Sequence, residues 1–260
     1  MPTKPGVVLV HGAWHTSWHF ENVVTELARE GYMVEAPTLP TVGHTAVDDA
    51  MAKAIATVKQ AIINITSSGR DAVVLCHSFG GVVGSEGVAA FEEERRRASD
   101  GSKQYGRITH LLYICAIIIE EGADCATRSS GAIAEELKDG MGRCLEPERF
   151  YNTMDPALAQ KCAARLLPQN RQAFAESAKY CGWGRYGIPA TYIVCKQDRA
   201  LPATVQTVFV ERIKAAGVKD FKIERIDCDH TPWLSSGRDE FFRILWDVMG
   251  RATLQGGSTL

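Results

Sequence analysis

Short apolar runs alternate with amphipathic stretches along most of the chain, and each kind predicts a different element. The runs rich in β-branched residues predict buried strands at 6–10, 32–35, 72–76, 108–119, 189–195 and 221–226. Apolar residues at helical spacing predict helices at 18–30, 47–65, 82–97, 203–216 and 239–249. Because strands and helices alternate, the fold class is α/β: a mostly parallel six-stranded sheet with helices on both faces.

This alternation stops after the fourth strand and resumes at residue 189. Between about 120 and 187 the pattern predicts no strand, only helical pieces at 132–138, 148–151, 156–167 and 171–179. Insertions of this size commonly cover a site. We therefore expect one core from residues 1–119 and 188–250, a helical cap or lid at 120–187, and a flexible polar tail at 251–260.

Composition narrows the range of partners. The 260 residues are 45% hydrophobic and 23% charged with a formal net charge of −2, which suits one globular domain and gives no electrostatic reason for nucleic acid or anionic membrane. No apolar run reaches bilayer length, and the N-terminus leaves no room for a signal peptide, so we expect a cytoplasmic protein. The eight cysteines include no C-x-x-C pair and are expected as thiols. Monomer and homodimer remain open.

The most informative stretch is the turn that follows the third strand. The run 72–76 leads directly into His77-Ser78-Phe79-Gly80-Gly81 and then into a helix. A serine on so abrupt a turn exposes its hydroxyl, and the crowding requires small neighbours, here Cys76 and Gly80. The stretch matches the G-x-S-x-G nucleophile turn, with Cys76 in the first glycine position. Taken alone, it leaves a nucleophile and a helix-capping serine equally open.

A serine nucleophile requires a base, and the base requires an orienting acid. Asp198 follows the strand at 189–195, and His230 follows the strand at 221–226. The carboxyl ends of parallel strands meet at one edge of a sheet, where open α/β folds place their sites. We therefore expect Ser78, His230 and Asp198 to form a catalytic triad.

Other carboxylates near these strand ends are alternatives for the acid. Glu120 and Glu121 leave the fourth strand and could reach His230 from its other side. Asp227 and Asp229 are close to His230 in sequence, but a residue so near rarely folds back to brace the ring. We interpret these two as solvated loop carboxylates.

Backbone N–H groups must stabilise the charge that develops on the substrate oxygen. The residue after the nucleophile, Phe79, should supply one, and the loop after the first strand should supply the other. Within that loop Gly12 permits close approach, and Ala13 is the expected donor.

The same loop carries His11, His15 and His19, whose spacing of four resembles that of metal ligands on a helix. Gly12 argues against a continuous helix, and no carboxylate cluster supports a metal, so we predict no metal and no cofactor. His11 is expected to hydrogen-bond the loop backbone. Trp14, His15 and Trp18 are expected to line the pocket or to pack against the first helix. The residues expected to contact the substrate are Gly12, Trp14, His15 and Trp18.

Taken together, these motifs resemble the α/β-hydrolase superfamily, and specifically its branch of plant methyl esterases, hydroxynitrile lyases and small fungal or bacterial hydrolases. The resemblance spans nearly the whole chain and rests on 7–15 with Trp18, 76–81, Asp198 with 200–202 and Gln206, and 229–230. It implies an α/β-hydrolase fold. The lyases carry threonine and lysine where this chain has Gly12 and Thr231, which favours an esterase.

The expected function is therefore cofactor-independent hydrolysis of a carboxylic ester or lactone of a small, mostly apolar molecule. Two alternatives stay open. The same site could run lyase or cyclase chemistry on a polyketide-like metabolite, or the chain could be a ligand-binding receptor on a hydrolase scaffold.

Overall fold

The main sheet confirms the predicted parallel architecture. The computed structural model describes residues 3–98, 104–125, 134–137, 139–179 and 182–256. Six strands lie in the order β2-β1-β3-β4-β8-β9, and each neighbouring pair is parallel. Their bounds are β1 Gly6–Val10, β2 Val34–Glu35, β3 Ala72–His77, β4 Ile108–Ile114, β8 Ala190–Cys195 and β9 Phe221–Ile226.

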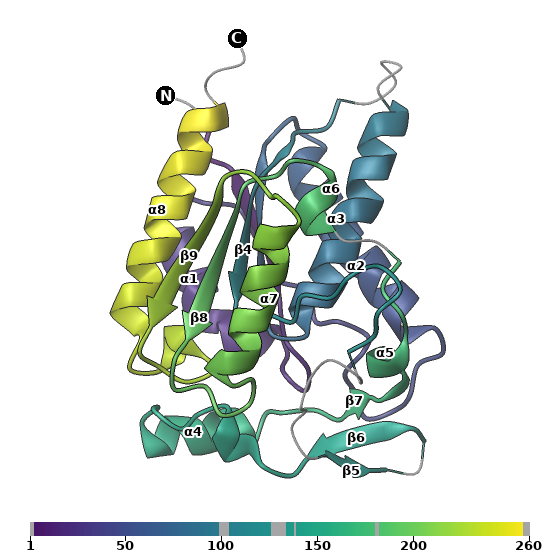
Figure 1. Ribbon diagram of the computed structural model, residues 1–260, viewed down its shortest axis with the longest axis vertical. Coiled ribbons are helices and arrows are strands. Elements are labelled where there is room, and N and C mark those ends of the chain that lie inside the picture. The colour runs from purple at the N-terminus through teal and green to yellow at the C-terminus, as the bar shows by residue number, and fades with distance from the viewer. Residues whose placement is uncertain (1–2, 99–103, 126–133, 138, 180–181, 257–260) are drawn as a thin grey trace.

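Helices cover both faces of this sheet (Figure 1). Helices α1 (Glu21–Arg29) and α8 (Arg238–Gly256) pack on one face, while α2 (Ala50–Thr66), α3 (Gly80–Arg97) and α7 (Ala203–Ala215) pack on the other. The side chains of β1 alternate between the two cores, with Val7 and Leu9 in the first and Val8 and Val10 in the second. Because both faces of the sheet are buried, side chains on either side of a strand are apolar, and the strands are therefore continuous apolar runs in the sequence.

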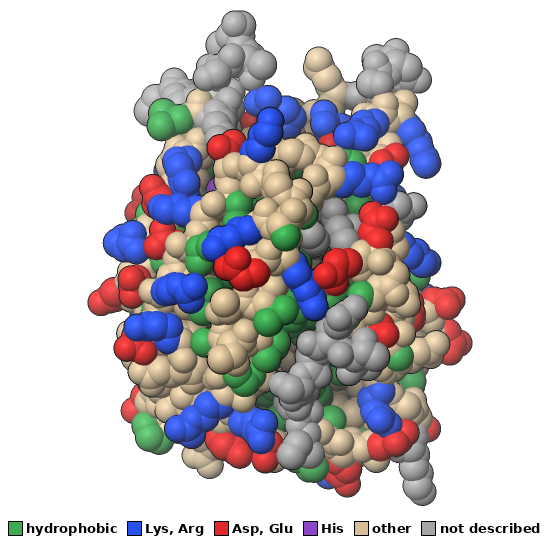
Figure 2. Space-filling model, in the orientation of Figure 1, with side chains coloured by type: hydrophobic (Ala, Val, Ile, Leu, Met, Phe, Trp, Pro, Cys, Tyr) green, Lys and Arg blue, Asp and Glu red, His purple; other side chains and the backbone are tan. Residues whose placement is uncertain are grey.

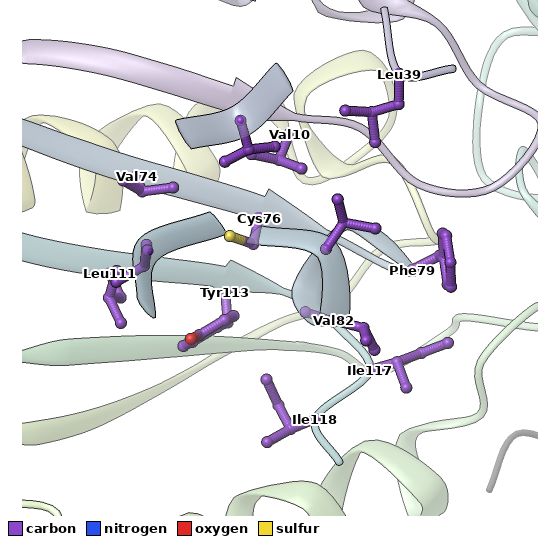
Figure 3. Close-up of a cluster of buried hydrophobic side chains, with 14 of the residues drawn as sticks. Val10, Leu39, Val74, Cys76, Phe79, Val82, Leu111, Tyr113, Ile117 and Ile118 are labelled. Atoms are coloured by element: carbon purple, nitrogen blue, oxygen red, sulfur yellow. The ribbon is translucent and has the colours of Figure 1, made fainter. Parts of the chain in front are cut away.

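Glycines let α3 approach the strand ends closely. A Cβ on Gly80 would lie 2.4 Å from the carbonyl oxygen of Val10. A Cβ on Gly84 would lie 2.3 Å from Cys76 Sγ, so this glycine makes room for the thiol that replaces glycine in the nucleophile turn. Figure 3 shows Cys76 among the buried side chains of this core. Packing at this density fixes the turn between β3 and α3.

The inserted segment, residues 120–187, differs from the prediction of a wholly helical cap. It contains a three-stranded antiparallel sheet in the order β5-β6-β7. The strands are β5 Ala134–Glu136, β6 Met141–Cys144 and β7 Gln169–Asn170, and the helices are α4 Pro156–Ala163, α5 Gln172–Ala175 and α6 Gly182–Arg185. In Figure 1, α4 and β5–β7 lie across the edge where the arrows of the main sheet end.

Strand β5 occupies 134–136 of the stretch predicted as a helix at 132–138, and residues 132, 133 and 138 of that prediction lie outside the described residues. Its alanine and glutamates favour a helix in isolation, but pairing with β6 overrides that local preference. The sequence did contain a signal for the hairpin: Asp139-Gly140, with Gly140 at φ 72°, is a typical tight-turn dipeptide.

Element ends differ elsewhere as well. The predicted helix at 171–179 is only the single turn of α5, and the piece at 148–151 is a 3₁₀ turn at Pro147–Arg149. Conversely, α8 continues to Gly256, into the stretch predicted as a tail. Its apolar residues up to Ala252 pack against the sheet, which extends the helix beyond its polar sequence signal.

Among the described residues, no helix is both long and apolar enough to cross a bilayer. On the face seen in Figure 2, acidic and basic side chains are interspersed and do not gather into a field of one sign.

Candidate active site

Ser78 lies on a strained turn between β3 and α3. Its φ of 52° is in the left-handed region, which costs a non-glycine residue about 1–2 kcal/mol. Backbone hydrogen bonds hold the turn: Ser78 N donates to Ile114 O at 3.2 Å, and Ser78 O accepts from Gly81 N and Ile117 N at 2.9 Å each. This geometry leaves the Ser78 side chain half-buried at the wall of a cavity, as expected of a nucleophile turn.

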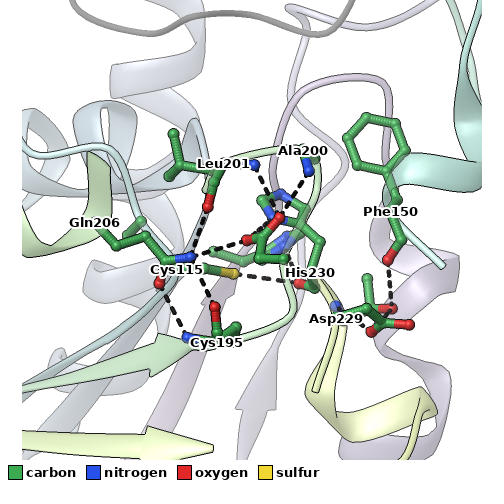
Figure 4. Close-up of polar contacts among 12 residues, drawn as sticks. Cys115, Phe150, Cys195, Ala200, Leu201, Gln206, Asp229 and His230 are labelled. Atoms are coloured by element: carbon green, nitrogen blue, oxygen red, sulfur yellow. Dashed lines mark hydrogen bonds and ion pairs between the residues drawn. The ribbon is translucent and has the colours of Figure 1, made fainter. Parts of the chain in front are cut away.

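His230 and Asp198 meet at the same edge of the sheet. His230 Nδ1 donates to Asp198 Oδ2 across 2.6 Å, and both side chains are buried. Three other donors hold the carboxylate: Ala200 N and Leu201 N reach Oδ1 at 2.8 Å each, and Gln206 Nε2 reaches Oδ2 at 3.1 Å (Figure 4). Four donors hold the orientation of the Asp198 carboxylate.

The hydrogen bond to Asp198 fixes the tautomer of His230. Since Nδ1 carries the proton, Nε2 is the basic nitrogen, and it is buried without a hydrogen-bond partner among the described residues. His230 and Ser78 line the same cavity, whose volume is about 420 Å³. An unpaired basic nitrogen that faces the same cavity as a serine hydroxyl can accept its proton during nucleophilic attack.

The two expected oxyanion donors also lie at this cavity. Ala13 and Phe79 line it, and no hydrogen bond from either amide is found within the described part of the chain. His11 orients the first of them: its Nε2 accepts from Leu39 N and its Nδ1 donates to Gly12 O, each at 2.8 Å. In a trans peptide the C=O and N–H point in opposite directions, so holding the Gly12 carbonyl fixes the direction of the Ala13 amide.

His77 and Cys115 brace the backbone of the catalytic histidine candidate. The carbonyl oxygen of His230 accepts from His77 Nε2 at 3.0 Å and from Cys115 Sγ at 3.2 Å. These three residues each offer a metal-ligand atom within 4.8 Å of the others. However, burial raises the pKa of Cys115 to about 12 and lowers the pKa of His77 well below its ordinary value. A neutral thiol and a proton-donating imidazole suit hydrogen bonding to a carbonyl better than metal binding.

Glu120 and Glu121 do not reach His230. Glu120 pairs with Arg212 at 3.0 Å, and Glu121 pairs with Arg185 at 3.7 Å. Both carboxylates therefore belong to ion pairs at the start of the inserted segment, and Asp198 alone bonds the imidazole.

The two aspartates beside His230 differ from one another. Asp227 is exposed, as predicted, and it pairs with Lys196. Asp229 was predicted to be solvated but is fully buried: it accepts from Thr153 N at 2.9 Å and from Thr231 N at 3.0 Å. The inserted segment brings Thr153 to it, a contact that no local pattern reveals.

Of the four residues expected to contact substrate, Trp14 alone lines the cavity. Its φ of 61° turns the loop, and its Nε1 donates to Gly142 O in β6 at 2.8 Å. Gly12 lies behind the wall instead, where a Cβ would come within 2.7 Å of Ser78 Cβ. Trp18 lies outside the cavity, with the Arg165 guanidinium 4.5 Å from its ring centre.

His15 also has a structural position rather than a place in the cavity lining. Its Nδ1 donates to Ala13 O at 2.8 Å, and its Nε2 accepts from Tyr151 OH at 3.0 Å. In the neighbouring His19, the Nε2 atom lies 3.2 Å from Cys162 O. The two histidines therefore attach the inserted segment to the first loop.

The inserted segment supplies cavity residues that the sequence did not single out. They are Ala134, Gly142, Phe150, Gln169, Arg171, Phe174 and Ala175. No motif marks them, because their role depends on how the segment folds over the strand ends. The Asp139-Gly140 turn was the one local signal for that arrangement.

The chain belongs to the Alpha/beta hydrolase family, which it matches over residues 7–244. It is 25% identical over 257 residues to the Alpha/beta hydrolase nvfD of Aspergillus novofumigatus, an alignment that covers 96% of this chain and 98% of that protein.

Solved structures show the same fold. Polyneuridine aldehyde esterase superposes with a TM-score of 0.69 at 20% identity, covering 95% of this chain and 99% of the esterase. The Arabidopsis methylesterase MES16 superposes with a TM-score of 0.68 at 17% identity, covering 94% and 98%. At these identities the likeness defines the fold, and the reaction has to be argued from the site.

Proposed function

We propose that this protein is a cofactor-independent serine hydrolase that cleaves a carboxylic ester or lactone of a small, mostly apolar molecule. The main support is His230: its Nδ1 is bound to Asp198, and its Nε2 is unpaired beside a cavity that Ser78 also lines. The largely apolar and aromatic lining favours an apolar substrate.

In the proposed reaction, Ser78 Oγ attacks the substrate carbonyl while His230 Nε2 takes the hydroxyl proton. The amides of Ala13 and Phe79 stabilise the oxyanion, and His230 returns the proton to the departing alcohol. Water then attacks the acyl-enzyme with His230 as base, which releases the acid and restores Ser78. Asp198 holds the tautomer and stabilises the imidazolium.

A panel of aryl and alkyl esters and lactones, assayed with the wild type and Ser78→Ala, tests this proposal. Without its nucleophile the enzyme should lose at least about 1,000-fold in kcat. Ser17→Ala is a matched control, because the Ser17 hydroxyl bonds Thr38 at an exposed position. Retention of most activity by Ser78→Ala would exclude the acyl-enzyme mechanism.

A fluorophosphonate probe separates the alternatives. A serine hydrolase should carry the adduct on Ser78, as located by mass spectrometry. Labelling without turnover of any ester would instead favour proton-transfer chemistry such as lyase or cyclase reactions. Tight ligand binding with negligible turnover would favour a receptor.

A further inference from the structure

Arg171 is the one permanently charged residue among the described residues that line the cavity, and no carboxylate lines it. The remaining walls are largely apolar and aromatic. An apolar pocket with a single cation selects a ligand that is apolar along most of its length and anionic at one point. We infer that the substrate carries, besides the scissile ester, a carboxylate that binds Arg171; this inference rests on the proposed ester hydrolysis.

The backbone and stem of Arg171 are fixed by the small sheet of the inserted segment. The residue follows β7, and its backbone N–H donates to Gly140 O at 3.0 Å. Its aliphatic stem packs on β6, where a Cβ at Gly142 would lie 3.1 Å from Arg171 Cγ. Because the stem is held against the sheet, little side-chain entropy remains to be lost when a ligand binds.

The present partner of Arg171 can be exchanged. Arg171 Nη1 lies 2.5 Å from Glu136 Oε2, but the two side chains are 46% and 67% exposed. An ion pair this exposed contributes little free energy. The guanidinium has five N–H donors in a planar fork, so it can bind a ligand carboxylate while keeping Glu136 or after releasing it.

The other polar side chain that the inserted segment contributes to the lining is neutral and already hydrogen-bonded. Gln169 is fully buried: its Oε1 accepts from Trp14 N at 3.4 Å, and its Nε2 donates to Asn170 O at 3.2 Å. Its amide orients the first loop against β7. Discrimination between charged and neutral ligands therefore falls to Arg171.

The test compares matched pairs of substrates. One series consists of methyl hemiesters of straight-chain dicarboxylic acids from succinate to sebacate, and a second consists of acetate esters of ω-hydroxy acids. Each is paired with the neutral ester of the same length ending in a methyl group. The wild type should show a lower KM for the acidic member in at least one series, by roughly 10- to 100-fold at the best chain length.

Variants assign this preference to Arg171. Arg171→Gln should raise KM for the acidic ester by about the same factor, leave kcat and the neutral ester nearly unchanged, and be partly rescued by Arg171→Lys. Arg143→Gln is the matched control: Arg143 pairs with Glu135 on the same hairpin but does not line the cavity. Glu136→Gln should lower KM for the acidic ester, since it removes the competing carboxylate.

Equal KM values for acidic and neutral esters in the wild type, or an equal loss for both in Arg171→Gln, would overturn the inference. A binding measurement keeps it independent of turnover. Calorimetry with Ser78→Ala should show tighter binding of octanoate than of octanamide, and Arg171→Gln in that background should remove the difference. If no ester is hydrolysed but this difference is found, the proposed function fails and the anion site stands. If octanoate and octanamide bind Ser78→Ala equally, the anion site fails.

Discussion

The contacts around the candidate triad differ from the polar contacts of the inserted segment. In the core, the Asp198 carboxylate has four donors, and the His230 loop is braced through its own carbonyl. The inserted segment reaches the core partly through apolar packing, since Phe150, Met154 and Cys162 belong to the same buried cluster as core residues. Separate polar contacts add to this packing, such as Tyr151 with His15 and Thr153 with Asp229. Around them it carries ion pairs that are largely exposed.

We expect the core to determine the chemical step and the inserted segment to determine which substrates bind. The groups proposed to react come from strand ends, whose positions follow from the packing of the whole sheet. The inserted segment supplies seven of the residues that line the cavity, and the other lining residues belong to the core. We therefore expect core changes to act on kcat, and segment changes to act on KM and on local stability.

Asp198→Asn should cause the largest effect, because it removes the charge that stabilises the imidazolium and disturbs the tautomer of His230. We expect kcat to fall about 10³- to 10⁴-fold, measured on the best ester of the panel. The asparagine oxygen can still accept from Ala200 N and Leu201 N, so unfolding should change little. Asp227→Asn, an exposed carboxylate near His230, is the control. A loss below tenfold in Asp198→Asn would mean that another group orients the base.

The second-largest effect should come from acid, which should weaken the contact between the core and the inserted segment. Burial lowers the pKa of His11 to about 4 and also lowers the pKa values of His15, His19 and His77. These groups bind protons more readily in the unfolded chain, so stability is fully present above about pH 6.5 and is lost as the pH falls towards 4. Buried Glu86, whose pKa is raised, acts in the opposite direction.

Urea unfolding at pH 7 and pH 4.5 measures this effect. For His11 alone, the shift corresponds to a loss of about 3 kcal/mol at the acid limit. Limited proteolysis at the two pH values should show the inserted segment released first, because His15 and His19 attach it. An unfolding free energy that does not fall with pH would contradict the assignment of these histidines as buried and neutral.

Tyr151→Phe should have the smallest effect. It removes the hydroxyl that donates to His15 Nε2 and leaves that nitrogen buried without a donor, at a cost of about 1 kcal/mol. Proteolysis within residues 120–187 should accelerate while the core resists. Tyr105→Phe is the control, since Tyr105 OH bonds Glu94 of α3 and does not contact His15. Equal cleavage rates in both variants would show that Tyr151 does not tie the segment to the core.

The sequence predicted the core well because its signals are local or repeated. Continuous apolar runs specify strands buried on both faces, and the crowded turn at Ser78 requires small neighbours that can be read directly. Asp198 and His230 were found because each follows such a run. The same reasoning failed at Ala134–Glu136, where residues that favour a helix form β5 by pairing with β6.

By itself, the sequence determined the parallel sheet, the nucleophile turn and the order of the candidate triad, since periodicity and turn chemistry depend on neighbouring residues. Only the tertiary structure decided which residues line the cavity. In the tertiary structure, Asp229 is buried against Thr153, and His15 bonds the inserted segment. Of the residues expected to contact substrate, Trp14 alone lines the cavity, and Arg171 forms part of its wall. The physical reason is that each of these roles depends on a partner far away in the chain, and a pattern of hydrophobic and polar positions carries no information about such partners.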